Sequence, residues 1–414
     1  MEMGTRVATA VVAVAAAVAA LATPAPASER LRIGIADSAE VLEQPERAFP
    51  AIARLRAQVI RVTLYWGSTR GVVRRRPENG ADPGDPAYDW RVVDRAVIEA
   101  DRRGIDVVFA VWGTPGWANG GNPPNRPPRN PVHLQAFAYA AATRYSGSYR
   151  RDDGRILPAV RDWIAWNEPN LRLGLARQWR REGRRWIPQS AYDYADICNA
   201  VYAGVHMTLI RDETVACGAT AARGNNNPNA RWSSVGPVGF LRAMRRAGVR
   251  RIDAYAHHPY AGGPREAPWA IPRNTTAITL GNIGRLGREV TRLYGPKPLW
   301  ITEYGYETSP PDTIFGVPWE RQARWLTAAF EIARRSPRID MMMWFLLRDE
   351  PRSRGWQSGL LTARGEEKPS FFAFQQEARL VAQARDENGP AHSPARSGPK
   401  KFAEPVALSS SPPD

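Results

Sequence analysis

Eight short apolar segments recur along the chain, separated by longer segments in which apolar residues follow a helical spacing. The apolar segments predict strands at Leu31–Ala36, Val59–Tyr65, Asp106–Val111, Trp163–Trp166, Thr214–Gly218, Ile252–Ala256, Leu299–Thr302 and Met341–Phe345. The periodic segments predict helices at Ala48–Ala57, Trp90–Arg103, Val132–Tyr145, Ala191–Ile210, Val238–Ala247, Ala277–Tyr294, Pro318–Arg335 and Ser370–Ala384. Because neighbouring parallel strands need a crossover connection, this alternation predicts a parallel sheet.

Eight strand–helix units in a chain of this length fit an α/β fold, a single-domain (β/α)8 TIM barrel with enlarged loops after its strands. The alternative is an open doubly wound sheet, but no glycine-rich nucleotide motif follows the first strand. The longest loops are expected at Gly67–Tyr88, Gly113–Arg129 and Asn170–Ser190. In a barrel of this kind the active site is built from such loops, at the carboxyl ends of the strands.

Two glutamates stand where predicted strands end. Glu168 follows the fourth strand and Glu303 ends the seventh. Barrel closure brings both strand ends to one rim, where two carboxyl groups can cleave a glycosidic bond: one protonates the leaving oxygen and the other attacks the anomeric carbon. The alternative is that both are ordinary acids at loop edges, making surface ion pairs.

The two carboxyl groups of such a pair must differ in protonation state, since one begins as the acid and the other as the nucleophile. Arg61, on the second predicted strand, could hold Glu303 charged. Tyr260, after the sixth strand, could donate a further hydrogen bond to the same carboxylate.

The two glutamate segments, Trp166-Asn167-Glu168-Pro169-Asn170 and Ile301-Thr302-Glu303-Tyr304-Gly305, resemble those of the clan A glycoside hydrolases. The chain is most similar to family 39 and neighbouring bacterial polysaccharide hydrolases, with family 5 next, over roughly Leu31 to Ala384. Further matches are Ile60-Arg61-Val62-Thr63, Phe240-Leu241-Arg242-Ala243, His257-His258-Pro259-Tyr260 and Trp344. The resemblance implies a retaining (β/α)8 enzyme.

By this resemblance Glu168 is the general acid/base and Glu303 the nucleophile. Asn167 would bind the sugar 2-hydroxyl, an interaction that strengthens in the transition state. Trp344 would provide a surface on which the sugar at the cleaved bond stacks.

The resemblance also implies that His258 and Tyr260 shape the pocket around the nucleophile. Either His257 or His258 could face the site. His258 is favoured because it completes a His-x-Tyr pattern with Tyr260, while His257 is expected to have a structural role.

Aromatic and basic residues gather in or beside the expected rim loops. Flat aromatic rings pack well against the apolar faces of sugars, so Trp112 is a candidate substrate-binding residue. The other candidates are Trp66, Trp117, Trp179 and Trp186, each of which could instead fasten a long loop to the barrel. Arg180, Arg181, Arg184 and Arg185 raise the hypothesis of an anionic sugar, because guanidinium groups bind carboxylates bidentately; a solvated surface is the favoured alternative.

The net charge of +16 comes almost wholly from arginine, since only four of the 57 basic residues are lysines. The arginines are scattered and form no nucleic-acid-binding signature, so no nucleic-acid partner is expected. Cys198 and Cys217 could form one disulfide or remain two buried thiols. No Cys/His cluster has zinc-ligand spacing, and neither a metal nor a cofactor is expected.

The two ends of the chain differ in composition from the barrel. Residues 1–27 read as a secretory signal peptide, with Arg6, an apolar run from Val7 to Leu21 and a cleavage site at Ala25-Pro26-Ala27. An uncleaved anchor is the alternative, although the run is short for a membrane span. Residues 28–385 would form the catalytic domain, and 386–414 a Pro/Ser-rich disordered tail.

The sequence therefore predicts a secreted retaining β-glycosidase, without stable membrane insertion and acting as a monomer on a polysaccharide or oligosaccharide, which could be anionic. A non-catalytic carbohydrate-binding barrel and a transglycosylase of the same fold are the alternatives. A basic envelope-associated interaction protein is a third, but it would leave both strand-end glutamates without a role.

Overall fold

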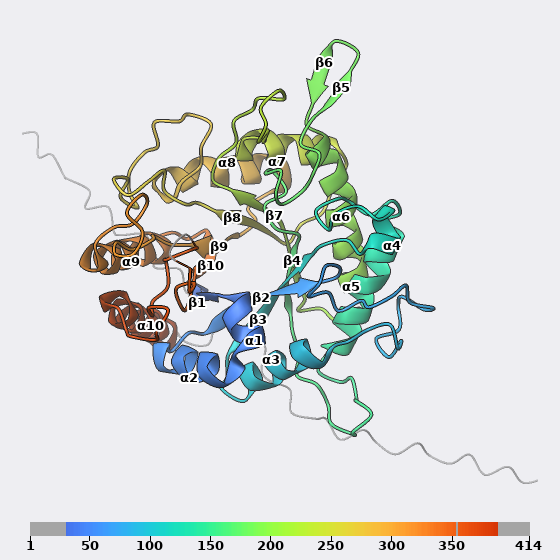
Figure 1. Cartoon of the computed structure of the whole chain (residues 1–414), viewed down its shortest axis with the longest axis horizontal. Helices are drawn as coiled ribbons and strands as arrows, with labels where there is room; N and C mark the ends of the chain where they lie inside the picture. The colour runs from blue at the N-terminus through green and yellow to red at the C-terminus, as the bar shows by residue number, and fades with distance from the viewer. Residues whose placement is uncertain (1–29, 353–354, 388–414) are drawn as a thin grey trace, which may run out of the picture.

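The computed structural model describes residues 30–352 and 355–387. Eight parallel strands close into a barrel with helices around it (Figure 1). This confirms the predicted (β/α)8 barrel, and the closed pairing excludes the open doubly wound sheet, which would have two unpaired edges. In pairing order the strands are β1 (Arg32–Ala36), β10 (Ile339–Trp344), β9 (Leu299–Tyr304), β8 (Ala254–His258), β7 (Thr214–Ala221), β4 (Asp162–Ala165), β3 (Asp106–Trp112) and β2 (Val59–Tyr65).

Each predicted strand overlaps one barrel strand, and the differences are at the ends. β8 continues to His258, two residues beyond the predicted end, and β7 continues to Ala221 instead of Gly218. These extra residues include the polar Thr220, His257 and His258, which interrupt the apolar runs from which the strands were predicted.

Each predicted helix also has a counterpart around the barrel. These are α2 (Pro45–Leu55), α3 (Arg91–Asp101), α5 (Val132–Arg144), α6 (Gln189–His206), α7 (Pro237–Arg246), α8 (Ile283–Tyr294), α9 (Trp319–Arg334) and α10 (Pro369–Glu387). Two short helices were not predicted: α1 (Ser38–Glu43) and α4 (Gly116–Asn119). The 3-10 turn η1 (Leu280–Asn282) lies within the predicted helix Ala277–Tyr294 and directly precedes α8.

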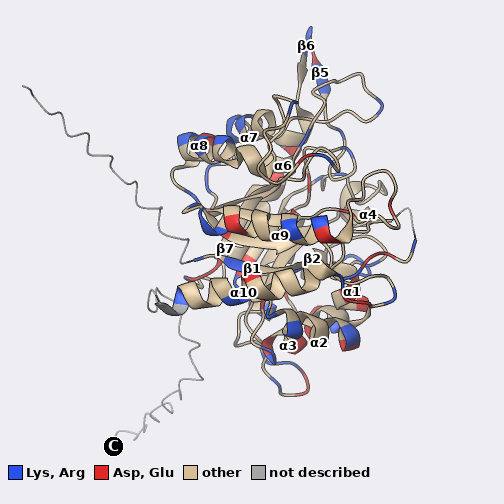
Figure 2. Ribbon diagram, turned by 90° about the vertical axis from the view of Figure 1, so that its left-hand side faces the viewer, with Lys and Arg blue, Asp and Glu red and all other residues tan. Residues whose placement is uncertain are grey.

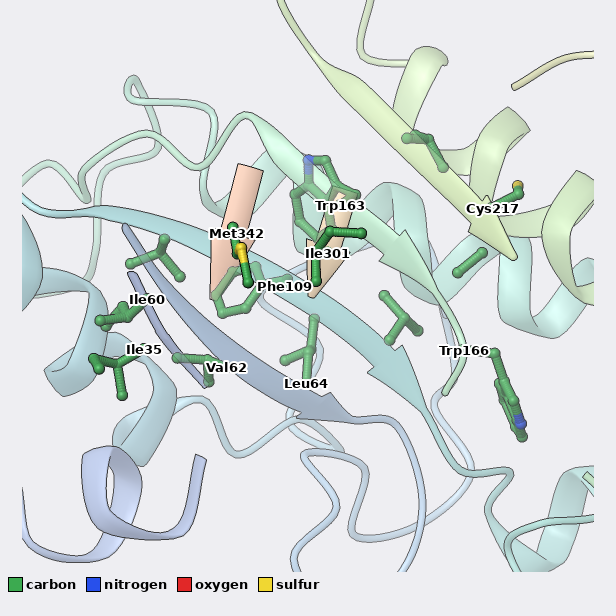
Figure 3. Packing of buried hydrophobic residues seen from close by; sticks show 14 of the residues in the cluster. Ile35, Ile60, Val62, Leu64, Phe109, Trp163, Trp166, Cys217, Ile301 and Met342 are labelled. Atoms are coloured by element: carbon green, nitrogen blue, oxygen red, sulfur yellow. The ribbon is translucent and has the colours of Figure 1, made fainter. Parts of the chain in front are cut away.

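Alternation along the strands divides the buried residues into two clusters. In β3, Phe109 and Val111 belong to the large cluster between the sheet and the helices, part of which Figure 3 shows. Val108 and Ala110 belong to a second cluster, which contains residues of all eight barrel strands and none of a helix. Successive side chains on a strand point to opposite faces, so the second cluster fills the barrel interior.

The same alternation turns the predicted site residues inward. On β2, Ile60 and Val62 pack toward the helices, so Arg61 between them points into the barrel. On β9, a register shift against β10 places one extra residue between Ile301 and Tyr304. Both of these flanking side chains pack on the outer cluster, which leaves Glu303 on the inner side.

A two-stranded antiparallel hairpin, β5 (Arg180–Glu182) and β6 (Arg185–Ile187), lies in the segment Asn170–Ser190 that was predicted as a loop. It projects away from the barrel at the top of Figure 1. Gly183, in the turn, has a φ of 58°, which glycine adopts at little cost and which suits the first position of a two-residue hairpin turn.

The outer surface carries scattered basic residues, which Figure 2 shows along several helices and at the tip of the hairpin. None of the described helices is long and apolar enough to cross a membrane. The predicted signal peptide lies outside the described residues, as does the predicted tail from residue 388 onward. α10 continues to Glu387, two residues past the predicted end of the domain.

Cys198 and Cys217 form a disulfide that ties α6 to β7. Both side chains are fully buried in the layer between helix and sheet. The sequence allowed either one disulfide or two buried thiols, and the structure has the disulfide.

We expect the double substitution Cys198→Ala/Cys217→Ala to lower the free energy of unfolding by about 3 kcal/mol, because a crosslink over a loop of this length restricts the unfolded chain. Urea unfolding of the oxidised wild type and the double variant measures the difference. Reduced wild type is the control, since it should unfold near the midpoint of the variant. Equal midpoints for the oxidised wild type and the variant would contradict the prediction.

Candidate active site

A cavity of about 820 Å³ opens at the carboxyl ends of the barrel strands. Its walls contain Arg61, Asn167, Glu168, Tyr260 and Glu303, five of the residues predicted for the site. Side chains from strands and loops far apart in the sequence therefore meet in one place, as barrel closure requires.

Glu168 sits on a tightly held loop after β4. Its backbone has a φ of 43°, a left-handed conformation that is unfavourable for a non-glycine residue and persists only where the surroundings enforce it. Its N–H donates to the Ala219 carbonyl at 2.9 Å. Gly174 packs so closely that a Cβ there would lie 2.1 Å from the Glu168 carbonyl oxygen. The loop thus aims the carboxyl group into the cavity.

Glu303 is 8% exposed and is bound from two sides. The Arg61 guanidinium donates from Nη1 to Glu303 Oε1 at 2.6 Å, and the Tyr260 hydroxyl donates to Oε2 at 3.2 Å. One short charge-assisted hydrogen bond and one phenol donor thus fix the position of the Glu303 side chain. This is the arrangement expected for Arg61 and Tyr260 from the sequence.

Arg61 also donates from Nη2 to the Asn167 side-chain oxygen at 2.6 Å. With that oxygen occupied, the amide N–H2 of Asn167 is the group left for a ligand. One buried guanidinium therefore links the nucleophile candidate on β9 to the segment that carries Glu168.

Burial raises the pKa of the Tyr260 phenol well above its ordinary value, and the nearby charges of Glu303 and Glu168 raise it further. Tyr260 therefore remains protonated over the whole working range of pH. It acts as a permanent donor to Glu303.

The structure brings His258, not its neighbour, to the two carboxyl groups. Its Nδ1 lies 3.0 Å from Glu168 Oε1 and 3.6 Å from Glu303 Oε2, while its Nε2 lies 2.9 Å from Thr302 Oγ1. An Nδ1 proton shared with Glu168 leaves Nε2 to accept from the threonine hydroxyl.

His257 faces the opposite side of the strand. Its Nδ1 lies 2.8 Å from Thr220 Oγ1 and its Nε2 lies 3.0 Å from the Ile278 carbonyl oxygen. Burial lowers the pKa of His257 to about 3, so the ring is neutral. It ties β8 to its neighbours.

The two glutamates lie close together. One carboxylate oxygen of Glu168, one of Glu303 and a nitrogen of His258 all fall within 4.8 Å of one another. Three such donors could in principle hold a metal ion, but Arg61 already neutralises Glu303, and a second cation at that carboxylate would be repelled. An oxygen–oxygen distance of no more than 4.8 Å agrees better with the ~5–5.5 Å between carboxyl groups in retaining glycosidases than with the ~6.5–9.5 Å in inverting ones.

The prediction that Trp344 provides a sugar-stacking surface is wrong. Its side chain is fully buried, its indole N–H donates to the Ser358 carbonyl at 2.8 Å, and it does not line the cavity. Alternation on β10 explains this, because Met342 and Trp344 belong to the outer cluster, whereas Phe345 packs against the inner one. Phe345 lines the cavity in its place.

The remaining aromatic candidates occupy three kinds of position. Trp112 lines the cavity, as predicted. Trp66, Trp117 and Trp179 pack against the main core instead, which corresponds to the loop-fastening alternative. Trp186 lies on the hairpin, 42% exposed and outside the cavity walls.

The four hairpin arginines, Arg180, Arg181, Arg184 and Arg185, do not line the cavity either. They are exposed to solvent on β5, β6 and the turn between them. They therefore do not contact a sugar held inside the cavity, and their exposure agrees with the solvated-surface alternative. The anionic-sugar hypothesis itself stays a prediction.

Several cavity residues were missed in the sequence. Asp37 directly follows β1, so the rule that identified Glu168 would also have identified it. It accepts three backbone hydrogen bonds, and burial raises its pKa to about 7. Glu307, Glu350 and Trp356 come from irregular loops, for which the sequence carried no periodic signal.

Glu307 makes the stability of the fold sensitive to pH. Burial raises the pKa of Glu307 to about 7, and the negative charges of Asp312 and Asp349 nearby raise it further. The hydrogen bond that the carboxyl group accepts from the Gln357 backbone N–H acts in the opposite direction. Because the folded state holds this proton more tightly than the unfolded chain does, Glu307 lowers stability as the pH rises from about 4.5 to about 7.

We therefore expect Glu307→Gln to raise Tm at a pH of about 8, where wild-type Glu307 is charged in the folded state. The gain should shrink toward zero at a pH of about 3, below both pKa values, where the carboxyl group is neutral in the folded and the unfolded state. Thermal unfolding of both proteins across this range measures the effect. A difference in Tm that does not change with pH would contradict the assignment.

No family model matches the sequence, and no curated protein matches it either. Solved structures do resemble the chain. A family 39 glycoside hydrolase from Bacteroides cellulosilyticus WH2 has a TM-score of 0.57 and 18% identity, covering 86% of this chain and 64% of that one. A glucosidase from Croceicoccus marinus has a TM-score of 0.62 and 15% identity, covering 87% and 68%.

A GH5_18 protein from Streptomyces cattleya, solved in complex with Manb1-4GlcNAc, has a TM-score of 0.53 and 16% identity, covering 84% of this chain and 80% of that one. The chain spans somewhat less than two thirds of the length of the family 39 structure. At these identities the likeness shows the fold. The fold is the (β/α)8 barrel that the alternation of strands and helices predicts.

Proposed function

We propose that this protein is a retaining glycoside hydrolase that cleaves β-O-glycosidic bonds of a polysaccharide or oligosaccharide. The observation that carries the proposal is the pair of carboxyl groups, Glu168 and Glu303, with oxygens within 4.8 Å of each other in one cavity. Their surroundings differ in the way that the two roles require. Glu303 is bound by Arg61 and Tyr260, whereas Glu168 is more exposed and contacts His258.

In the first step Glu303 attacks the anomeric carbon and forms a glycosyl ester, while Glu168 gives its proton to the departing glycosidic oxygen. In the second step Glu168, now a carboxylate, takes a proton from water, whose oxygen attacks the same carbon and releases Glu303. The two inversions together retain the configuration. Asn167, whose amide N–H2 remains free, would hold the sugar 2-hydroxyl through both steps.

A long glycan is supported by where the exposed tryptophans lie. Within the described residues, those with the most exposed side chains are Trp186, Trp232, Trp269 and Trp356. Each belongs to a segment that follows the carboxyl end of a barrel strand, on the face where the cavity opens. Sugar rings stack on exposed indoles, and a substrate longer than one or two sugars would reach them.

Export of the protein is part of the proposal. The sequence of residues 1–27 supports it, and so does the disulfide, because disulfides persist mainly in oxidising compartments. The substrate would then be an extracellular or cell-envelope glycan.

Glu303→Ala should abolish turnover of aryl β-glycosides that the wild type cleaves, because no other group can form the glycosyl ester. Added azide should restore a slow reaction and give the α-glycosyl azide, since the small anion enters from the side that Glu303 occupied. Glu320→Ala, an exposed glutamate of α9, is the matched control. Undiminished activity of the Glu303 variant would exclude it as the nucleophile.

Glu168→Ala should slow the cleavage of substrates with poor leaving groups by about 10²–10⁴-fold, the usual contribution of a general acid. With dinitrophenyl glycosides the rate of the first step should fall much less, because dinitrophenolate leaves without being protonated. Proton NMR of the first product formed by the wild type reports the anomeric configuration. An inverted product would exclude the proposed mechanism, and binding of glycans without any turnover would favour the non-catalytic barrel.

A further inference from the structure

The hairpin of β5 and β6 is an element that the barrel does not need. All seven residues from Arg180 to Trp186 are exposed, so the hairpin adds nothing to the core. An isolated two-stranded hairpin is marginally stable in water, and this one projects from the rim instead of packing on it (Figure 1). Its side chains are directed at solvent or at something that binds from solvent.

The charge of the hairpin is strongly positive. It carries one acidic residue, Glu182, and four arginines: Arg180, Arg181, Arg184 and Arg185. Glu182 lies 3.3 Å from Arg180, and Arg181 donates to the Gly183 carbonyl at 3.1 Å. Arg184 and Arg185 have no ion pair among the described residues, so their guanidinium groups are open to an anion.

Strand pairing places a basic and an aromatic group side by side. Arg181 on β5 is directly opposite Trp186 on β6, so the two side chains share one face of the hairpin. The indole is 42% exposed. A flat ring beside a guanidinium fits a sugar that carries a carboxylate, since the sugar face stacks on the indole and the carboxylate accepts two N–H groups.

The hairpin also has a defined place relative to the catalytic cavity. It is inserted between the loop that carries Glu168 and α6, so it belongs to the same rim. None of its residues lines the cavity. It can therefore contact a long chain outside the cavity but cannot hold the sugar at the cleaved bond.

We propose that the hairpin is a docking arm for an acidic polysaccharide. Arg181 and Trp186 hold the polymer on one face, while Arg184 in the turn and Arg185 on the opposite face add positive charge. That the docked polymer is also the substrate rests on the function proposed above; the docking itself does not. The arm raises the local concentration of polymer at the rim, and its attraction weakens with salt because the groups are exposed.

The test uses the full chain and two polymers with the same backbone, polygalacturonate and its fully methyl-esterified form, which lacks the charge. We expect the wild type to bind polygalacturonate, to bind the ester much more weakly, and to lose affinity for the acid form as salt increases. Arg181→Glu/Arg184→Glu/Arg185→Glu should weaken binding by about tenfold or more, because it replaces attraction by repulsion. Trp186→Ala should weaken binding to a degree that salt does not change.

The matched control is Arg288→Glu/Arg324→Glu/Arg379→Glu, which changes the net charge equally on exposed positions of α8, α9 and α10. It should bind polygalacturonate within about twofold of the wild type, since these residues lie on the outer helices. Circular dichroism checks that both triple variants are folded, and Arg184→Glu alone serves if the hairpin triple variant is not.

Equal loss of binding in both triple variants would overturn the docking arm, because net charge alone would then explain the effect. Hairpin-dependent binding of single-stranded DNA or of anionic phospholipid vesicles as tight as that of polygalacturonate would also overturn it. If the polymer binds through the hairpin but no glycan is ever cleaved, the docking arm stands and the proposed hydrolase fails. If a neutral glycan is cleaved but the hairpin variant binds polygalacturonate as tightly as the wild type, the hydrolase stands and the docking arm fails.

Discussion

Two hydrogen bonds of the Arg61 guanidinium hold the candidate active site together. Its guanidinium is 4% exposed and donates to Glu303 on one side and to Asn167 on the other. Removing one partner of a buried ion pair costs about 3–5 kcal/mol, because the other charge is left uncompensated. Glu303 can remain buried in the barrel because the positive charge of Arg61 compensates its negative charge. The same cation fixes where the segment with Glu168 stands, and so it sets the distance between the two acids.

Strand alternation determines which side chains take part in this arrangement. Arg61 points inward because its neighbours on β2 pack toward the helices, and His258 points inward because Tyr255 and His257 occupy the outer side of β8. The same rule moves Trp344 out of the site and Phe345 into it. Strand alternation could have identified His258 as the inward histidine and rejected Trp344 from the sequence alone. The apolar runs locate each strand, and the position of a residue along the strand then tells which face its side chain occupies. The extra residue on β9 is different: a bulge has no periodic signature, and the inward direction of Glu303 depends on it.

The rest of the site depends on irregular backbone, which explains why the sequence did not reveal it. Glu307, Glu350 and Trp356 reach the cavity through loops whose course is set by contacts such as the buried Lys368–Asp349 pair. Such pairs join residues that no spacing rule connects. The hairpin was hidden for a related reason, since its strands are three residues long and polar, and periodicity detects only strands that bury one face.

Charge is distributed differently in the candidate active site and on the hairpin. The protein carries a net charge of +16, yet five carboxyl groups and only three guanidinium groups line the cavity. Each of the three guanidiniums already has a carboxylate partner: Arg61 pairs with Glu303, Arg70 with Glu43 and Arg223 with Glu266. An acidic sugar would find little compensation there, whereas the unpaired arginines of the hairpin offer it outside. A polymer that combines neutral and acidic sugars satisfies both regions, with a neutral unit at the carboxyl pair and an acidic unit on the arm.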